Sequence, residues 1–195
     1  DDIFDIDAVL TGNVDGGTGS NTLQGNVFTN SVITNLDGTG ADGTALGAVT
    51  GGYVEIDNLI GSAGGTLTGL NEVGFWNLTL APTYQTFGGT VGFNGFSTLQ
   101  GGSDVDFFTA IANNSPFNIL GGDGADFVQV NAGATLTGNV NTEAGADLVL
   151  FAGNTGNIVG NVNFGSSGTL AYGFASPVSV TLNAVGTTDG FQGLA

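Results

Sequence analysis

Apolar and polar residues alternate in short runs along this chain, and glycine-rich turns separate the runs. In Gly121–Val140 (GGDGADFVQVNAGATLTGNV), one turn precedes the run FVQV and a second precedes TLTGNV. Alternation with a period of two predicts β-strands that bury one face. The order of turn, strand, turn and strand recurs about every 20 to 22 residues in four successive stretches: Gly101–Leu120, Gly121–Val140, Asn141–Val162 and Asn163–Asn183.

A short ending also recurs, in which an apolar residue and any second residue precede Gly-Asn-Val. Its two apolar positions are four residues apart, which places them on one face of a strand. A helix would also align them, but Gly-Asn beside β-branched valine disfavours a helix. The ending occurs at Leu10–Val14, Leu23–Val27, Leu136–Val140 and Ile158–Val162.

A repeat of about 20 residues is too short for helical-hairpin or propeller repeats and suits one coil of a solenoid. We therefore predict an all-β fold, a parallel β-solenoid (β-helix) with coils of about 20–22 residues that stack as parallel strands. A single domain covers 1–195, with a less regular central region at 37–100. In that region Asp37–Thr50 is predicted to be a loop, and Pro82 and nearby aromatic residues mark a protrusion from the stack: Trp76, Tyr84, Phe87, Phe93 and Phe96.

Stacked coils place equivalent side chains in columns. The predicted interior column comprises Phe4, Phe108, Val128 and Val149, and two residues further on come Ile6, Val130 and Phe151. The flanking positions are apolar as well: Ile3, Phe107, Phe127 and Leu148. Strict alternation turns this flanking column outward, as an apolar stripe suited to docking. The alternative is that the adjacent turn rotates it into the core.

Composition excludes several classes of function. The chain has 17 acidic residues and no lysine, arginine, histidine or cysteine. Nucleic-acid binding through phosphates lacks its basic residues. A zinc site of His or Cys and a His- or Cys-based active site are equally excluded. We predict that the protein is not an enzyme, although carboxylate pairs such as Asp5 with Asp7, or Asp104 with Asp106, satisfy the minimum for glycoside hydrolysis.

The turn Gly121–Phe127 (GGDGADF) resembles the haemolysin-type, or RTX, calcium repeat, GGxGxDx followed by an apolar residue. Gly101–Phe108 and Gly16–Leu23 are degraded copies, and Asn21 replaces the aspartate in the second. The family's repeats follow one another every nine residues, whereas here the motif comes about once per coil. More broadly, the chain resembles bacterial surface β-strand-repeat proteins, which include haemagglutinin-like adhesins. The resemblance implies Ca²⁺ as a cofactor, with these candidate ligands: Asp106, Asp126, Asp147, Asp104 and Asp123.

The residues give an independent reason to examine these aspartates. In a solenoid Asp106, Asp126 and Asp147 stack about 4.8 Å apart, and like charges at that spacing repel. Because the chain has no basic side chain, a bound cation, protonation or N–H donors from the turns must offset the repulsion.

From these features we predict a secreted, extracellular or cell-surface structural protein. Its solenoid subunits would assemble end to end through open strand edges into a filament, sheath or surface layer. The alternative is a calcium-stabilised stalk or ligand-binding segment of a large secreted adhesin. The expected partners are further copies of the chain in a head-to-tail polymer and, as a candidate ligand, surface polysaccharide. Neither nucleic-acid binding nor membrane insertion is expected, since no apolar run reaches the ~20 residues of a membrane helix.

Overall fold

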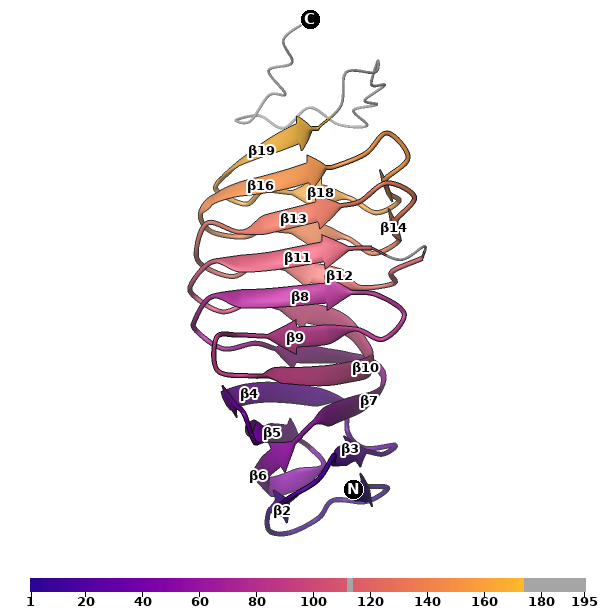
Figure 1. Cartoon of the computed structure of the whole chain (residues 1–195), viewed down its shortest axis with the longest axis vertical. Coiled ribbons are helices and arrows are strands. Elements are labelled where there is room, and N and C mark those ends of the chain that lie inside the picture. The colour runs from indigo at the N-terminus through magenta and orange to yellow at the C-terminus, as the bar shows by residue number, and fades with distance from the viewer. Residues whose placement is uncertain (112–113, 174–195) are drawn as a thin grey trace, which may run out of the picture.

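The structure, a computed structural model, describes residues 1–111 and 114–173. These residues form nineteen β-strands and no helix, which confirms the all-β prediction. Seventeen of the strands belong to one large, mostly parallel sheet. They lie across the long axis of the molecule, one above another (Figure 1). With no helix in these residues, none is long and apolar enough to cross a membrane.

One row of hydrogen-bonded strands extends from the first strand to the last. In spatial order its members are β1 (Ile3–Asp5), β3 (Thr22–Gln24), β7 (Asn58–Thr68), β10 (Thr90–Gln100), β9 (Thr83–Gln85), β8 (Gly74–Leu78), β11 (Asp106–Ala110), β13 (Phe127–Val130), β16 (Ala146–Phe151) and β19 (Ser167–Tyr172).

A second row shares the long strands β7 and β10 with the first. Its other members are β2 (Val14–Asp15), β6 (Val49–Ile56), β5 (Gly40–Leu46), β4 (Asn30–Asp37), β12 (Asn118–Leu120), β15 (Val140–Asn141) and β18 (Val162–Asn163). The short strands β14 (Thr135–Leu136) and β17 (Asn157–Ile158) form a separate parallel pair.

The pairing register reproduces the repeat read from the sequence. Phe107 of β11 pairs with Phe127 of β13, twenty residues later, and Phe127 pairs with Leu148 of β16, twenty-one residues later. In the second row Val140 of β15 pairs with Val162 of β18, twenty-two residues later. After β10, the chain alternates between the two rows, so each repeat adds one strand to each. The predicted repeated strand pattern is therefore confirmed for this half of the chain.

The two faces of the first row differ as alternation predicts. On the inner face Phe108, Val128 and Val149 are fully buried in one register, and Trp76 stacks on Phe108 with ring centroids 5.5 Å apart. Phe4 lies at the far end of this row, paired with Leu23, and is half-buried.

The flanking apolar column faces outward. Phe107, Phe127 and Leu148 are half-buried, and Ile3 is 70% exposed. Phe107 stacks against Phe75 of β8 at 5.3 Å. Of the two alternatives, the structure favours the outward stripe over membership in the core.

The prediction that Asp37–Thr50 is a loop was wrong. Residues 40–46 form β5, which pairs antiparallel with β4 and β6. Small side chains make this possible, since Ala41 and Ala45 are fully buried. A Cβ on Gly43 would lie 2.4 Å from the Val32 carbonyl oxygen, so only glycine fits between these strands.

The predicted protrusion was also wrong. Trp76, Tyr84, Phe93 and Phe96 are at most 4% exposed. Instead, β9 forms a hairpin inside the first row, antiparallel to both β8 and β10. Among the aromatic residues named for the protrusion, Phe87 at the hairpin turn projects, with 87% of its surface exposed. Antiparallel strands thus interrupt the parallel register at 30–100, which lies mostly inside the region expected to be irregular.

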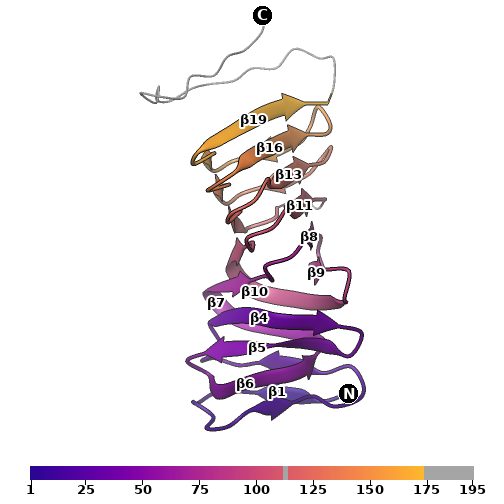
Figure 2. The same ribbon diagram turned by 90° about the vertical axis from the view of Figure 1, so that its left-hand side faces the viewer.

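The strand layers continue to β19 at the end opposite the N-terminus (Figure 2). The last part of the fourth sequence repeat, Asn163–Asn183, lies outside the described residues.

Candidate functional site: a column of buried aspartates

Three of the predicted calcium ligands form a column inside the first row. Asp106 begins β11, Asp126 directly precedes β13, and Asp147 is the second residue of β16. The pairing of these strands places the three residues in adjacent layers, and their exposures are 0%, 1% and 2%. Burying three carboxyl groups in a chain without basic side chains costs free energy unless polar partners offset it. We call Asp106, Asp126 and Asp147 the aspartate column.

Hydrogen bonds link successive members of the aspartate column. The Asp106 backbone N–H donates to Asp126 Oδ1 at 2.9 Å, and the Asp126 N–H donates to Asp147 Oδ1 at 3.0 Å. The carboxyl groups of Asp126 and Asp147 therefore each cap the start of the strand one layer earlier. The structure thus supports the third of the predicted remedies for repulsion, N–H donors, although the donors come from strand starts as well as from turns.

The remaining oxygens of the column have different surroundings. Asp106 accepts from the Gly102 N–H at 2.8 Å and from the Trp76 indole N–H at 2.9 Å. Asp147 Oδ2 accepts from the Thr142 hydroxyl at 2.6 Å. Asp126 Oδ2 is buried and has no hydrogen-bond partner, the one such side-chain atom in the described residues.

The space around Asp126 Oδ2 depends on Gly121. A Cβ at this position would lie 2.4 Å from Asp126 Oδ2 and 2.5 Å from the Thr142 carbonyl oxygen. Glycine is therefore required at position 121 by packing between layers, because any larger residue would collide with both oxygens.

Burial determines the charge state that the column favours. The pKa of Asp126 rises to about 7, chiefly through burial, against the lowering effect of the bond from the Asp106 N–H and with smaller raising effects from the charges of Asp106, Asp147 and Glu143. Burial likewise raises the pKa of Asp106 to about 6, opposed by the hydrogen bonds from Gly102 and Trp76. A protonated Asp126 would convert its unpartnered acceptor into a donor.

Asn21 shows how a neutral side chain fills the corresponding place near the N-terminal end. It is fully buried directly before β3, and its Oδ1 accepts from the Asp2 N–H at 3.1 Å. Its Nδ2 donates to the Gly17 and Glu55 carbonyl oxygens at 3.3 and 3.5 Å. An amide here satisfies both of its polar atoms, whereas the carboxylate of Asp126 leaves one oxygen without a donor.

The other two predicted ligands lie apart from the column. Asp104 and Asp123 are both exposed, and the Asp104 carboxyl group accepts from the Val105 N–H. In the described part of the chain, no group of three or more Asp or Glu residues has a geometry that could hold a metal ion.

Sequence reasoning missed two partners of the column, Trp76 and Thr142. Thr142 precedes Asp147 by five residues, the spacing that separates Gly101 from Asp106 and Gly121 from Asp126. That substitution of threonine for glycine was the available signal. Trp76 carried none, because it lies thirty residues from Asp106 and reaches it through the pairing of β8 with β11.

Comparisons of this chain with protein-family models, with curated proteins and with solved structures find no match. Its function must therefore be inferred from its own residues.

Proposed function

We propose that this protein is a β-solenoid that serves as a structural subunit outside the cell and assembles end to end into a filament, sheath or surface layer. Within this proposal the two rows of parallel strands are two sides of successive coils of about 20–22 residues. The composition supports a structural role, because the chain has none of the basic or thiol side chains on which most catalysis depends.

The observation that carries the proposal is the open edge of β1. Among the described residues this strand pairs only with β3. Phe4 is half-buried there, whereas Leu23 and Leu59, its successors in the same register, are fully buried. A further parallel strand on this edge would bury Phe4 and pair the free backbone groups.

The edge of β1 can be blocked selectively. Asp2 O and Ile6 N–H bond to β3, and alternate residues of a parallel strand bond to opposite sides. Ile3 and Asp5 therefore present their backbone groups to the open edge. Ile3→Pro removes an outward N–H at the first residue of β1, where proline is tolerated.

Electron microscopy and light scattering of the purified chain over a range of concentrations test the assembly. We expect concentration-dependent filaments for the native chain and their loss in Ile3→Pro. The matched control is Phe87→Ser, which removes an exposed apolar residue away from β1 and should assemble normally. Monodisperse short rods at every concentration and calcium level would refute the proposal.

A second candidate function is a calcium-stabilised segment of an adhesin, and the unpartnered Asp126 Oδ2 favours it. Ca²⁺ takes six to eight oxygen ligands, and the site offers that oxygen with the Thr142 carbonyl oxygen nearby. These oxygens therefore supply only part of a Ca²⁺ coordination shell, and water molecules would have to supply the remaining ligands.

Thermal unfolding with Ca²⁺ and then with a chelator tests this candidate. If Ca²⁺ binds the folded state, the melting temperature rises with calcium concentration and falls on chelation. Asp126→Asn should abolish that response while the variant remains folded. A melting temperature that ignores calcium would eliminate the candidate.

A further inference from the structure

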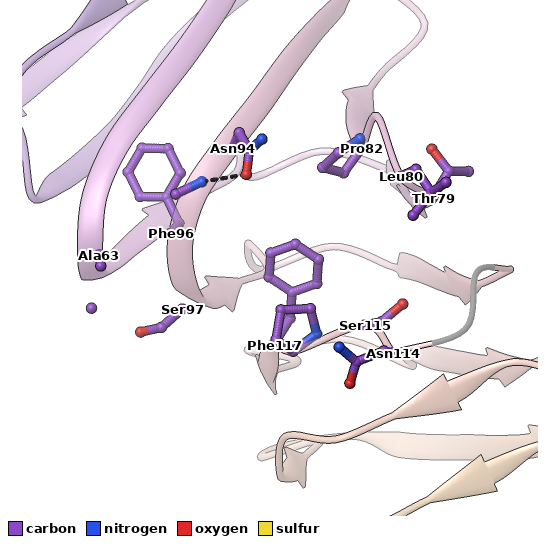
Figure 3. A pocket seen from close by; sticks show the side chains of 13 residues that line it. Ala63, Thr79, Leu80, Pro82, Asn94, Phe96, Ser97, Asn114, Ser115 and Phe117 are labelled. Atoms are coloured by element: carbon purple, nitrogen blue, oxygen red, sulfur yellow. Dashed lines mark hydrogen bonds between the residues drawn. The ribbon is translucent and has the colours of Figure 1, made fainter.

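A groove opens on the side of the molecule where four chain segments come together (Figure 3). They are residues 63–64 in β7, 79–82 after β8, 94–97 in β10 and 114–117 before β12. They line an open hollow of about 360 Å³, a volume within the range of small-molecule sites.

The backbone creates this hollow. Gly64, Gly95 and Asn114 all have positive φ, at 104°, 78° and 66°. The register of β10 against β7 shifts between Asn94 and Phe96, so the strand bulges there. A Cβ on Gly95 would lie 1.9 Å from the Gly61 carbonyl oxygen, and only glycine allows the bulge. Three positive-φ residues around one hollow show that its shape is set by the fold.

The walls combine apolar and amide surface. Pro82, Phe96 and Phe117 supply apolar surface to the lining, and all three are buried. Leu80 stands on the rim with 89% of its surface exposed. Figure 3 shows Asn94 and Asn114 on opposite sides of the groove, with the Phe117 ring between them.

Both amides have capacity for a ligand. Asn94 Oδ1 accepts from the Gly95 N–H at 2.8 Å, and Nδ2 of Asn94 has no partner among the described residues. The Asn114 side chain makes no hydrogen bond within them either. Two exposed amides beside apolar surface can bond the hydroxyl groups of a ligand that also carries apolar faces.

Charge narrows the class of ligand. None of the thirteen lining residues is ionisable, although the chain carries 17 acidic residues. The net charge of −17 repels anionic polymers, and no cationic side chain exists to hold them. A cation would find no carboxylate in the groove. The surface therefore suits an uncharged, polyhydroxylated molecule.

We propose that this groove binds a short segment of a neutral polysaccharide. The exposed Leu80 contacts the apolar face of a sugar ring, and the Asn94 and Asn114 amides bond its hydroxyl groups. This binding goes beyond the proposed structural role and does not depend on assembly. The lining residues come from the middle of the stack, away from the open edge of β1.

Affinity electrophoresis of the full chain in gels containing dextran, mannan or mixed-linkage β-glucan tests the proposal, with alginate as the anionic comparison. Neutral hexasaccharides are then titrated by calorimetry. We expect retardation by at least one neutral polymer, none by alginate, and a Kd of about 1 mM or tighter.

Two variants locate the site. Leu80→Asp places a charge on the rim, and Asn114→Gly removes an amide while keeping the positive φ. Each should weaken binding at least about fivefold, the equivalent of one lost hydrogen bond. The matched control is Leu46→Asp, which changes another exposed leucine outside the groove and should bind normally.

Three results would overturn the proposal: no neutral polymer binds, alginate binds best, or Leu80→Asp and Asn114→Gly bind as tightly as the native chain. Unchanged melting temperatures show that the variants fold. Light scattering of the same samples reports assembly separately, so failure of filament formation and failure of glycan binding are distinguishable.

Discussion

At the scale of single residues, the three members of the aspartate column share a position but not a chemical state. Asp106 and Asp147 have donors for both of their oxygens, whereas Asp126 has a donor for one. A buried acceptor without a donor costs free energy, and protonation relieves that cost. The effect of removing each charge should therefore differ in sign along the column.

Asp126→Asn should stabilise the protein by about 1–2 kcal/mol at pH 8. The amide oxygen keeps the bond from the Asp106 N–H, and Nδ2 replaces the oxygen that lacks a donor, as in Asn21. Urea unfolding at pH 8 measures the change.

The matched control is Asp106→Asn. Both Asp106 oxygens accept from N–H groups that cannot reverse their polarity, on Gly102 and Trp76. In the variant, the Nδ2 donor would face one of these N–H donors without an acceptor between them. The free energy of unfolding should therefore fall by about 1–3 kcal/mol. Equal effects of the two substitutions would contradict the assignment of Asp126 as the unpartnered member.

Gly121→Ala should destabilise the protein by more than 2 kcal/mol, because overpacking costs about 1–3 kcal/mol and the collision here involves backbone. The new Cβ would lie 2.5 Å from the Thr142 carbonyl oxygen. Gly38→Ala is the control, since nothing lies within 4 Å of a Cβ at that position. Denaturant midpoints of the two variants should differ clearly, and similar midpoints would refute the packing role of Gly121.

At the scale of elements, alternation makes each strand of the first row two-sided. In β11 Phe108 is fully buried between Trp76 and Val128, while Phe107 is half-buried in the outer stripe. The adjacent residues Phe107 and Phe108 should therefore contribute very differently to the stability of the fold.

Phe108→Ala should cost about 3–5 kcal/mol, the usual loss for a buried phenylalanine, because a cavity remains beside Trp76. Phe107→Ala should cost about 1 kcal/mol, since it loses ring contacts with Phe75 and Phe127 but little burial. Thermal unfolding of both variants provides the comparison. A larger loss for Phe107→Ala would mean that the stripe belongs to the core.

At the scale of the whole molecule, pH should change stability in an unusual direction. The pKa values of Asp106 and Asp126 rise in the folded state from 3.8 to about 6 and about 7, chiefly through burial. Between the unfolded pKa of 3.8 and the raised folded pKa values, the folded state binds more protons than the unfolded state, so the free energy of unfolding falls as pH rises. It should be greatest near pH 4 and decline through pH 6 to 7.

Chemical denaturation from pH 4 to pH 8 measures this decline. Mutual repulsion of 17 acidic residues acts in the same direction, but salt screens exposed charges more than buried ones. At high salt, the slope of the free energy of unfolding against pH should be smaller in Asp126→Asn than in the native chain. Stability that rises from pH 4 to pH 8 would contradict the direction of both pKa changes.

Much of the fold was predictable because the signal is local. The run FVQV at 127–130 indicated one strand, and the repeat placed its counterpart in Asn141–Val162 with Phe127 and Leu148 as equivalent positions, which the pairing of β13 with β16 confirms. The candidate site was predictable in part for the same reason, since Asp126 and Asp147 hold equivalent places in successive repeats. The antiparallel β5 could not be predicted, because its alanines and glycines acquire strand structure only between β4 and β6.

By itself the sequence determined the strand repeat, the absence of cationic side chains and the alignment of three aspartates, since each depends on residue type and spacing alone. The tertiary structure decided which carboxyl oxygen lacks a donor, and it created the side groove. Both depend on packing between layers: Trp76 reaches Asp106 thirty residues away, and residues 63–64 of β7 line one groove with residues 114–117. Such contacts arise from how layers pack, and no local pattern encodes that packing.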